Sequence, residues 1–431
     1  MKKVLAGSNE QGRRVKINKL LSIIYLLVAS CALAFVVQAS EDASGNNIRP
    51  RLSTDEVENQ VAMDREANPL YESRLLAPIH KWKNKVAEKT GFNWSLDYSA
   101  LFMSVSGSPD EDNASGGMVR FFGYWDLVNR GGPNKGSLNW KVENRHSYTD
   151  VPPSGLGFES GYVGLFEPPF SDQQTRLTNL YWKQYFVEGK WAAVLGFLDA
   201  TDFVDVYLLA SPWTGFNSFV FSTGSATMDL PNDAGLGIAV GGMVVEKVYI
   251  QAGIADANSD PTKPFDGFDS VASDSDFFKW VEIGFTPRHD KLYFDNVHLT
   301  FWHVDERVNG TPDGWGINAS WQQWIADKWL PFVRGGYTED SGSLLEKSLT
   351  AGIGYQPVPM RGVIGLGFNW GKPNETSFGE LDEQYTTELF WRYQLTKELA
   401  VTPSIQYIKD PALNEEEDNL WIFGLRARVV L

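Results

Sequence analysis

Apolar and polar side chains alternate residue by residue through most of this chain, and this period of two constrains its fold more than any other feature. From Phe92 onward the alternation recurs in sixteen segments of about ten to sixteen residues, bounded by Gly, Pro, Asn and Asp. Such segments are typical of β-strands with one apolar and one polar face. The predicted strands are 92–104, 117–128, 136–147, 176–187, 190–199, 234–244, 247–256, 277–287, 291–306, 314–325, 329–339, 344–356, 361–371, 384–395, 398–409 and 419–431.

The connections between these strands fall into two classes. Those after even-numbered strands are mostly tight, as at Glu188-Gly189 and Thr396-Lys397, although the first of them, 129–135, is longer. Those after odd-numbered strands are often long, and the largest are 148–175, 200–233 and 257–276. Outer-membrane barrels have short periplasmic turns and long outer loops, and a strand tilted by about 45° crosses a bilayer in about ten residues. The sequence therefore predicts an all-β fold, a transmembrane antiparallel β-barrel of about sixteen strands.

The two faces of each strand fit this prediction. In Gly136–Ser147 the apolar set alternates with a set that contains Lys141, Glu143 and Arg145. A lipid-facing cation costs about 2–4 kcal/mol at the bilayer midplane, so the charged set must face the lumen. Aromatic residues near strand ends are predicted to form the interfacial girdles: Tyr98, Trp125, Trp191, Trp329, Tyr385 and Trp421. A soluble β-protein with half-buried strands also alternates and stays an alternative.

The first 39 residues have the pattern of a secretory signal peptide. Six cations precede the apolar run Leu20–Val37, and small residues lead to a cleavage site after Ala39. An uncleaved transmembrane helix and a lipoprotein signal at Cys31 are the alternatives. After a polar segment, Pro78 and Gly91 suit the two ends of a helix at 77–88, either periplasmic or plugging the lumen. The predicted division is 1–39 signal peptide, 40–91 polar segment with a short N-terminal helix, and 92–431 barrel.

Charge and cysteine content exclude other classes of protein. The net charge is −16, and it becomes −21 without the signal peptide, which also carries the one cysteine. A nucleic-acid-binding protein needs clustered cations, so nucleic acid is not an expected partner. An exported, acidic chain without cysteine suits a bacterial periplasm or outer membrane better than a disulfide-built secreted domain.

Several motifs in order resemble the carbohydrate-selective outer-membrane porin family of OprB type, and the likeness runs from about Ala77 to Leu431. The strand ending in Gly196-Phe197-Leu198-Asp199, followed by Asp202-Phe203, is similar to a family segment that has Lys where this chain has Phe197. Thr214–Phe219 resembles a Phe-Asn-Phe-type segment of the family. The ending from Thr402 through Gln406-Tyr407-Ile408 to Gly424-Leu425-Arg426 also matches its pattern, although barrels usually end in Phe rather than Leu431.

The resemblance implies an outer-membrane porin for passive, carbohydrate-selective diffusion of sugars, with no cofactor. A barrel of this size encloses a water-filled lumen, and weak, repeated hydrogen bonds allow a sugar to pass. The inward residues predicted to line its path are Arg120, Lys141, Glu143, Arg145, Glu282, Asn296, Arg334, Glu388, Arg392, Arg426 and Arg428. The loop 200–233 is the candidate constriction, with Trp213, Phe216, Asn217 and Phe219; its aromatic residues alternatively only pack against the wall.

Signals for catalysis or metal binding are poor. The sequence lacks Gly-x-Ser-x-Gly, His-Glu-x-x-His, a Walker loop and Cys-x-x-Cys, and no metal site is predicted. Alternatives are a general or ion-selective porin, and, from another class, an outer-membrane barrel enzyme or a secreted sugar-binding β-protein. The expected partners are sugars, outer-membrane lipids and the outer-membrane insertion machinery; whether the chain forms a homo-oligomer stays open.

Overall fold

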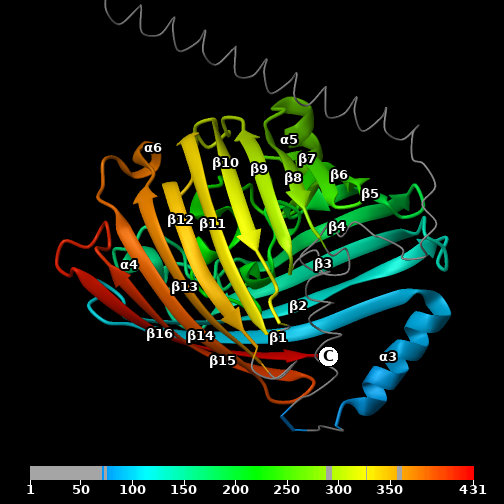
Figure 1. Cartoon of the computed structure of the whole chain (residues 1–431), viewed down its shortest axis with the longest axis horizontal. Coiled ribbons are helices and arrows are strands. Elements are labelled where there is room, and N and C mark those ends of the chain that lie inside the picture. The colour runs from blue at the N-terminus through cyan, green and yellow to red at the C-terminus, as the bar shows by residue number, and fades with distance from the viewer. Residues whose placement is uncertain (1–69, 72–74, 288–293, 327, 357–361) are drawn as a thin grey trace, which may run out of the picture. The chain divides into compact units, whose positions relative to one another are not determined.

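A computed structural model describes residues 70–71, 75–287, 294–326, 328–356 and 362–431, all within the unit Ile48–Leu431. The predicted signal peptide and most of the polar segment lie outside the described residues. The described part is a closed antiparallel barrel of sixteen strands, preceded by one helix (Figure 1). The predicted fold class is therefore confirmed.

Each strand pairs with its neighbours in sequence, and β1 closes the ring against β16 from Asp97↔Val430 to Val105↔Ile422. The strand bounds are β1 (Phe92–Val105), β2 (Asn113–Val128), β3 (Gly136–Ser147), β4 (Gln174–Phe186), β5 (Trp191–Leu198), β6 (Gly235–Val245), β7 (Val248–Asp256), β8 (Phe277–Phe285), β9 (Asn296–Val304), β10 (Gly314–Gln322), β11 (Trp329–Asp340), β12 (Leu345–Tyr355), β13 (Gly362–Pro373), β14 (Gln384–Gln394), β15 (Leu399–Lys409) and β16 (Asn419–Val430). A closed sheet leaves no unpaired edge, which satisfies the backbone within a bilayer.

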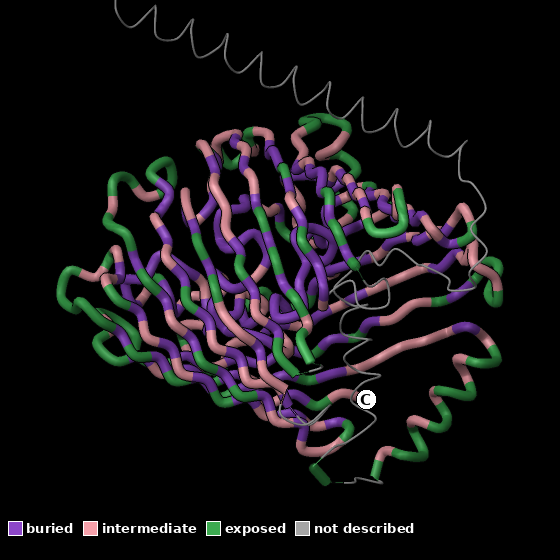
Figure 2. Tube along the Cα trace, in the orientation of Figure 1, coloured by how far each residue is buried: buried purple, intermediate pink, exposed green. Residues whose placement is uncertain are grey.

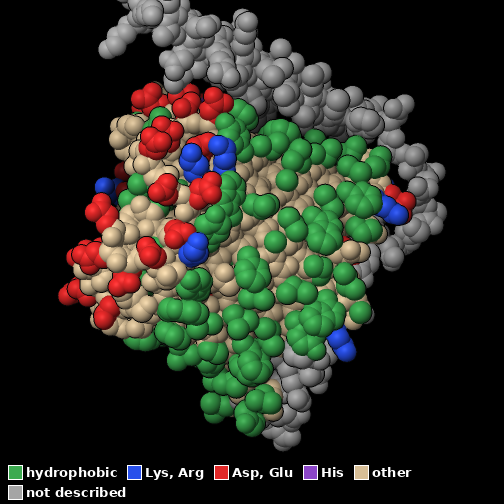
Figure 3. Space-filling view, turned by 60° about the vertical axis from the view of Figure 1, so that its left-hand side comes forward, with side chains coloured by type: hydrophobic (Ala, Val, Ile, Leu, Met, Phe, Trp, Pro, Cys, Tyr) green, Lys and Arg blue, Asp and Glu red, His purple; other side chains and the backbone are tan. Residues whose placement is uncertain are grey.

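Burial alternates along the strands as the sequence predicts (Figure 2). In β16, Trp421, Phe423 and Leu425 are about half exposed on the outside, whereas Arg426 and Arg428 are buried inside. Hydrophobic side chains accordingly cover much of the outer wall in Figure 3, while acidic side chains gather at one end. Because the apolar outer face needs lipid around it, this surface fits a membrane-embedded barrel.

The predicted aromatic girdle is mostly at the surface. Five of its six residues are 39–46% exposed: Tyr98, Trp125, Trp329, Tyr385 and Trp421. Trp191 is the exception, because it is only 8% exposed. It pairs with Gly242 across β5 and β6, and the indole lies in the space that the missing side chain leaves. Trp191 shares the outward parity of Leu195 in β5, which is 60% exposed, so it lies on the outer wall but packs against β6 rather than standing out from it.

Long connections follow the odd-numbered strands and shorter ones mostly follow the even-numbered strands, so the barrel has a long-loop end and a short-turn end. At this end β8 stops at Phe285 and β9 begins at Asn296, while residues 288–293, which include the predicted start of the ninth strand, lie outside the described residues. Asp295, just before β9, accepts a hydrogen bond from the backbone of Trp324 in the next turn at 2.7 Å.

Helix α3 (Ala77–Thr90) precedes β1 and extends two residues beyond the predicted helix. It ends where Gly91 adopts φ +76°, a left-handed conformation that glycine takes without steric cost, and the Gly91 N–H donates to Ala87 at 2.8 Å. Figure 1 shows α3 beside the start of β1 and outside the ring of strands, so in this structure it does not plug the lumen. None of the described helices is long and apolar enough to cross a bilayer.

Candidate functional site

The loop between β5 and β6, residues 199–234, folds into the barrel and contacts the inner faces of several strands. It consists of short 3-10 turns, η1 (Ala200–Asp202), η2 (Leu208–Ala210), η3 (Phe219–Phe221) and η4 (Thr223–Ala226). We call this segment the inserted loop. Most of its residues are buried, and much of the apolar core lies between it and the wall. The inserted loop therefore occupies part of the barrel interior.

The inserted loop carries five aspartates and no cation. Four of these aspartates form ion pairs with basic residues outside the loop. Asp202 pairs with Lys141 at 2.7 Å, and Asp229 pairs with Arg307 at 2.7 Å. Asp233 pairs with Arg145 at 3.0 Å and with Arg176 at 2.7 Å, and Asp205 pairs with Arg334. The acidic loop is thus held by basic residues of the strands and, through Arg307, of the β9–β10 connection.

Asp205 is the centre of the most connected of these anchors. It pairs with Arg334 of β11, and its Oδ1 lies 2.7 Å from Nε2 of His298 on β9. Its Oδ2 accepts from the backbone N–H of Gly224, while its own N–H donates to Glu282 of β8 at 2.9 Å. Although burial opposes ionisation, the charge of Arg334 and the hydrogen bond with His298 hold the pKa of Asp205 below its usual value.

The second half of the inserted loop is anchored through its backbone. Glu388 of β14 accepts the N–H groups of Asn217 and Ser218 at 2.7 and 2.9 Å. Arg426 of β16 donates to the Asn217 side chain at 2.9 Å and pairs with Glu167 of the β3–β4 loop. Burial raises the pKa of Glu167 well above its usual value, even though the charge of Arg426 acts in the opposite direction.

The predicted constriction residues differ in their surroundings. Phe216 and Asn217 are buried, while Trp213 and Phe219 are partly exposed. Phe216 packs on Phe221 and on the wall residue Phe390, with ring centroids 4.5 and 4.8 Å apart. Trp213 instead stacks on the guanidinium of Arg120, 3.8 Å from its ring centroid. Phe216 therefore packs the inserted loop against the wall, whereas the ring face of Trp213 contacts the cationic side chain of Arg120.

A glycine in the wall makes the close approach of the loop possible. Gly367 of β13 faces inward, and a Cβ built there would lie 2.6 Å from Phe221 and 3.1 Å from Phe216. Any side chain at this position would meet the aromatic rings. The Phe216–Phe221 pair therefore occupies the space that a side chain of β13 would otherwise fill.

All eleven predicted lumen residues are buried inside the barrel. Many of them anchor the inserted loop rather than face open water: Arg120, Lys141, Arg145, Glu282, Arg334, Glu388 and Arg426. Others support these anchors: Arg428 shares Asp97 with Arg120, Glu143 pairs with Arg145, and Asn296 lies 2.8 Å from His298. A role of these residues in contacting sugar stays a prediction.

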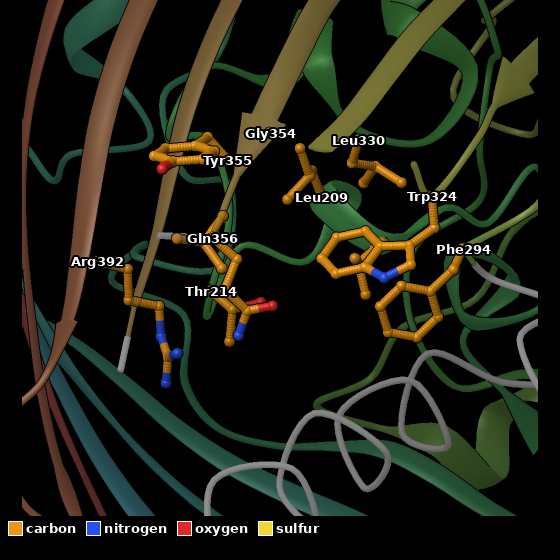
Figure 4. A pocket seen from close by; sticks show the side chains of 11 residues that line it. Leu209, Thr214, Phe294, Trp324, Leu330, Gly354, Tyr355, Gln356 and Arg392 are labelled. Carbon is orange, nitrogen blue, oxygen red and sulfur yellow. The ribbon is translucent and has the colours of Figure 1, made fainter. Parts of the chain in front are cut away.

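Arg392 differs from the rest because it lines a small, open cavity at the short-turn end (Figure 4). In Figure 4 the rings of Trp324 and Phe294 lie on one side of this cavity, and Arg392, Gln356 and Thr214 lie on the other. Leu209 and Leu330 line the cavity between these two sides. We call it the vestibule. An aromatic side opposite polar groups suits a ligand with both kinds of surface.

The sequence analysis missed Asp97, Asp205, Glu167 and His298, each of which holds a predicted residue or the loop in place. The sequence does contain one indication that the inserted loop needs basic partners. Asp199, Asp202 and Asp205 recur at every third position in a segment without cations, so their partners had to come from elsewhere in the chain. Nothing in the sequence indicates which cations these partners are. Among the described residues no cluster of His, Cys, Asp and Glu could hold a metal ion.

The model of the carbohydrate-selective porin OprB family matches residues 135–431 of this chain. No curated protein sequence matches it. The high-pH structure of Pseudomonas putida OprB is similar with a TM-score of 0.67 and 15% identity, over 82% of this chain and 97% of that one. The low-pH structure of the same protein gives a TM-score of 0.51 at 15% identity, over 84% and 99%. The departure at Phe197 lies on the outer wall, where Phe197 packs between Phe265 and Phe268 with ring centroids 5.7 and 5.6 Å away.

Proposed function

The chain belongs to the OprB family of carbohydrate-selective porins, and we propose that sugars diffuse through its barrel past the inserted loop and leave through the vestibule. Sugars are thus its permeants. The family and the fold point to a transport channel of the outer membrane rather than to an enzyme. Its short-turn end then faces the periplasm, as in other outer-membrane barrels.

The observation that carries this proposal is the pairing of charges inside the lumen. Most basic residues around the inserted loop have an acidic partner within about 3 Å, as Lys141 has Asp202 and Arg145 has Glu143. Ion-selective pores use a ring of charges of one sign. Paired charges of opposite sign produce a weaker electric field in the lumen than such a ring does. The same side chains still present both hydrogen-bond donors and hydrogen-bond acceptors. Such a wall favours neutral, hydrogen-bonding solutes over ions.

The vestibule provides the second kind of contact that a sugar needs. One face of a sugar ring carries mainly C–H groups and can lie on Trp324, while its hydroxyls reach Arg392, Gln356 and Thr214. Each contact is weak, and conduction requires binding that is weak enough to release the solute. The vestibule therefore supports passage rather than tight capture.

The remaining features of export and assembly belong to this proposal. We propose that a signal peptide is cleaved after Ala39 and that the mature chain consists of the segment 40–91 and the barrel 92–431. The insertion machinery of the outer membrane and its lipids are the expected partners. The exposed girdle residues, with Trp421 46% exposed, support contact with lipid.

Selectivity between sugars and ions of equal size tests the proposal. We expect liposomes that contain the purified protein to swell faster in monosaccharides than in size-matched organic ions, and sugars to block the ionic current in planar bilayers. The reversal potential in a salt gradient should stay near zero. Equal swelling rates without current block would instead indicate a general porin, and a large reversal potential would indicate an ion-selective one.

A further inference from the structure

Helix α3 has an apolar face that the barrel leaves largely uncovered. Leu75, just before the helix, is 84% exposed, and Ile79 and Trp82 are 38% and 56% exposed. With Val86 they recur at spacings of three and four residues, so they lie along one side of the helix. None of the residues of α3 is fully buried.

Lysines border this apolar face. Lys81, Lys85 and Lys89 recur every four residues, and Lys83 lies on the other side of Trp82. Glu88 is the one acidic residue in the helix. A basic amphipathic helix with tryptophan on its apolar side is typical of segments that lie in a membrane interface. Lysine stems can lie along the apolar boundary while their ammonium groups reach phosphates.

Polar contacts attach α3 to the short-turn end of the barrel. His80 Nε2 lies 3.1 Å from Glu398 Oε1, and Lys83 donates to the backbone carbonyl of Leu431. The indole N–H of Trp125 donates to the carbonyl of Thr90 at 3.1 Å. These contacts fix the helix at the rim of the barrel while its apolar face stays available.

The apolar face of α3 continues the lipid-facing wall. Trp82 meets Trp94 edge to face, with ring centroids 6.2 Å apart. Trp94 has the outward parity of Tyr98 in β1, and its ring lies 6.1 Å from that of Phe121, which is 40% exposed on the outside of β2. Lys83 Nζ lies 4.5 Å from the centre of the Trp94 ring. The helix therefore joins the aromatic girdle at the level where hydrocarbon meets headgroups.

We propose that α3 is a membrane-interface anchor, which lies in the headgroup layer of the periplasmic leaflet and binds anionic phospholipids. Its apolar face enters the acyl boundary beside Trp94, and Lys81, Lys85 and Lys89 contact lipid phosphates. Continuity with the girdle favours lipid over a protein partner, and the positive charge of the helix complements an anionic surface, in contrast to the acidic chain as a whole. The barrel gains a second contact with its leaflet, beside the wall.

Depth measurements on single cysteines test this anchor. The mature chain has no cysteine of its own if cleavage follows Ala39, so Ile79→Cys and Asn84→Cys each place one label on the mature protein. Asn84 is exposed on the side of the helix away from Ile79 and serves as the matched control. In bilayers of phosphatidylglycerol and phosphatidylcholine, we expect a label at 79 to be quenched from the lipid phase and a label at 84 from water. Labels that are equally accessible to an aqueous quencher would overturn the proposal.

Charge reversal tests the lipid class. The variant Lys81→Glu/Lys85→Glu/Lys89→Glu should weaken docking of the helix by about fivefold per lysine in anionic bilayers, and far less in phosphatidylcholine alone. Lys263→Glu in the β7–β8 loop, at the other end of the barrel, is the control and should change nothing. Heat-modifiable gel mobility shows that each barrel is folded. Shielding of the label at 79 from both quenchers, with cross-linking between copies, would assign the face to a second copy of the chain and refute the anchor.

Discussion

Arg334 of β11 and Asp205 of the inserted loop form a buried ion pair across 129 positions of sequence. Arg334 also donates to the backbone carbonyl of Asp205 at 3.1 Å, so one guanidinium holds both the side chain and the main chain of that residue. Both side chains are at most 2% exposed. The pair therefore fixes the position of the loop in the lumen more firmly than a solvent-exposed pair would.

Removing Asp205 should release the inserted loop. Asp205→Ala leaves Arg334 buried without its acidic partner, which typically costs about 3–5 kcal/mol. The backbone amides of Asn217 and Ser218, in another part of the inserted loop, donate to Glu388 of β14. We expect these amides to exchange with solvent deuterium at least about a hundredfold faster in the variant. Asp269→Ala, in an exposed part of the β7–β8 loop, is the control. Equal exchange in the two variants would show that Asp205 is not an anchor.

Acid should loosen the same anchor. The pKa of Asp205 lies below the usual 3.8 in the folded barrel, so its ionised form stabilises the loop at neutral pH. This contribution is complete above the ordinary pKa and is lost as the pH falls through the lowered value. A spin label at Thr214→Cys should therefore become more mobile only below about pH 4.

The variant Asp205→Asn is the control for this pH dependence. It keeps the size of the side chain and removes its ionisation, so the label should show no transition linked to position 205. An acid transition of the same size in Asp205→Asn would show that other titratable groups cause it. Glu282 and His298 are two such groups in contact with residue 205.

A side chain at Gly367 should displace the aromatic part of the loop. Gly367→Val places carbon atoms where Phe216 and Phe221 lie, and such overpacking typically costs about 1–3 kcal/mol. We expect a lower urea midpoint for unfolding in lipid vesicles and faster chymotrypsin cleavage at the loop. Gly131→Val is a suitable control, because a Cβ at Gly131 would meet no atom within 4 Å. Unchanged cleavage in Gly367→Val would contradict the packing described here.

Shortening Trp324 should weaken the interaction of sugars with the vestibule. A sugar face that covers about 50 Å² of the indole gains about 1 kcal/mol, so Trp324→Ala should raise the sugar concentration for half-block of the current about fivefold. Trp421→Ala, on the outer wall, tests for general effects of losing a tryptophan. If both variants are blocked like the unaltered protein, the vestibule is not on the sugar pathway.

The sequence by itself determined the barrel. Alternation along β3 and β16 assigned Lys141, Arg426 and their neighbours to the inside, because the period of a strand is two and charge on a lipid face is costly. The ends of most strands followed from turn residues, and Gly91 marked the end of α3. These are local properties, which the order of residues along one segment is enough to specify.

Only the tertiary structure decided what the inward residues do. Arg334 meets Asp205, and Arg426 meets Glu167, across 129 and 259 positions, and nothing near either residue in sequence indicates its partner. Curvature of the closed sheet sets which strands the inserted loop can reach, and Gly367 leaves space for its rings. Many of the charges predicted to line the lumen also anchor the inserted loop, and the sequence could not show this, because an ion pair depends on distance in space and not on distance along the chain.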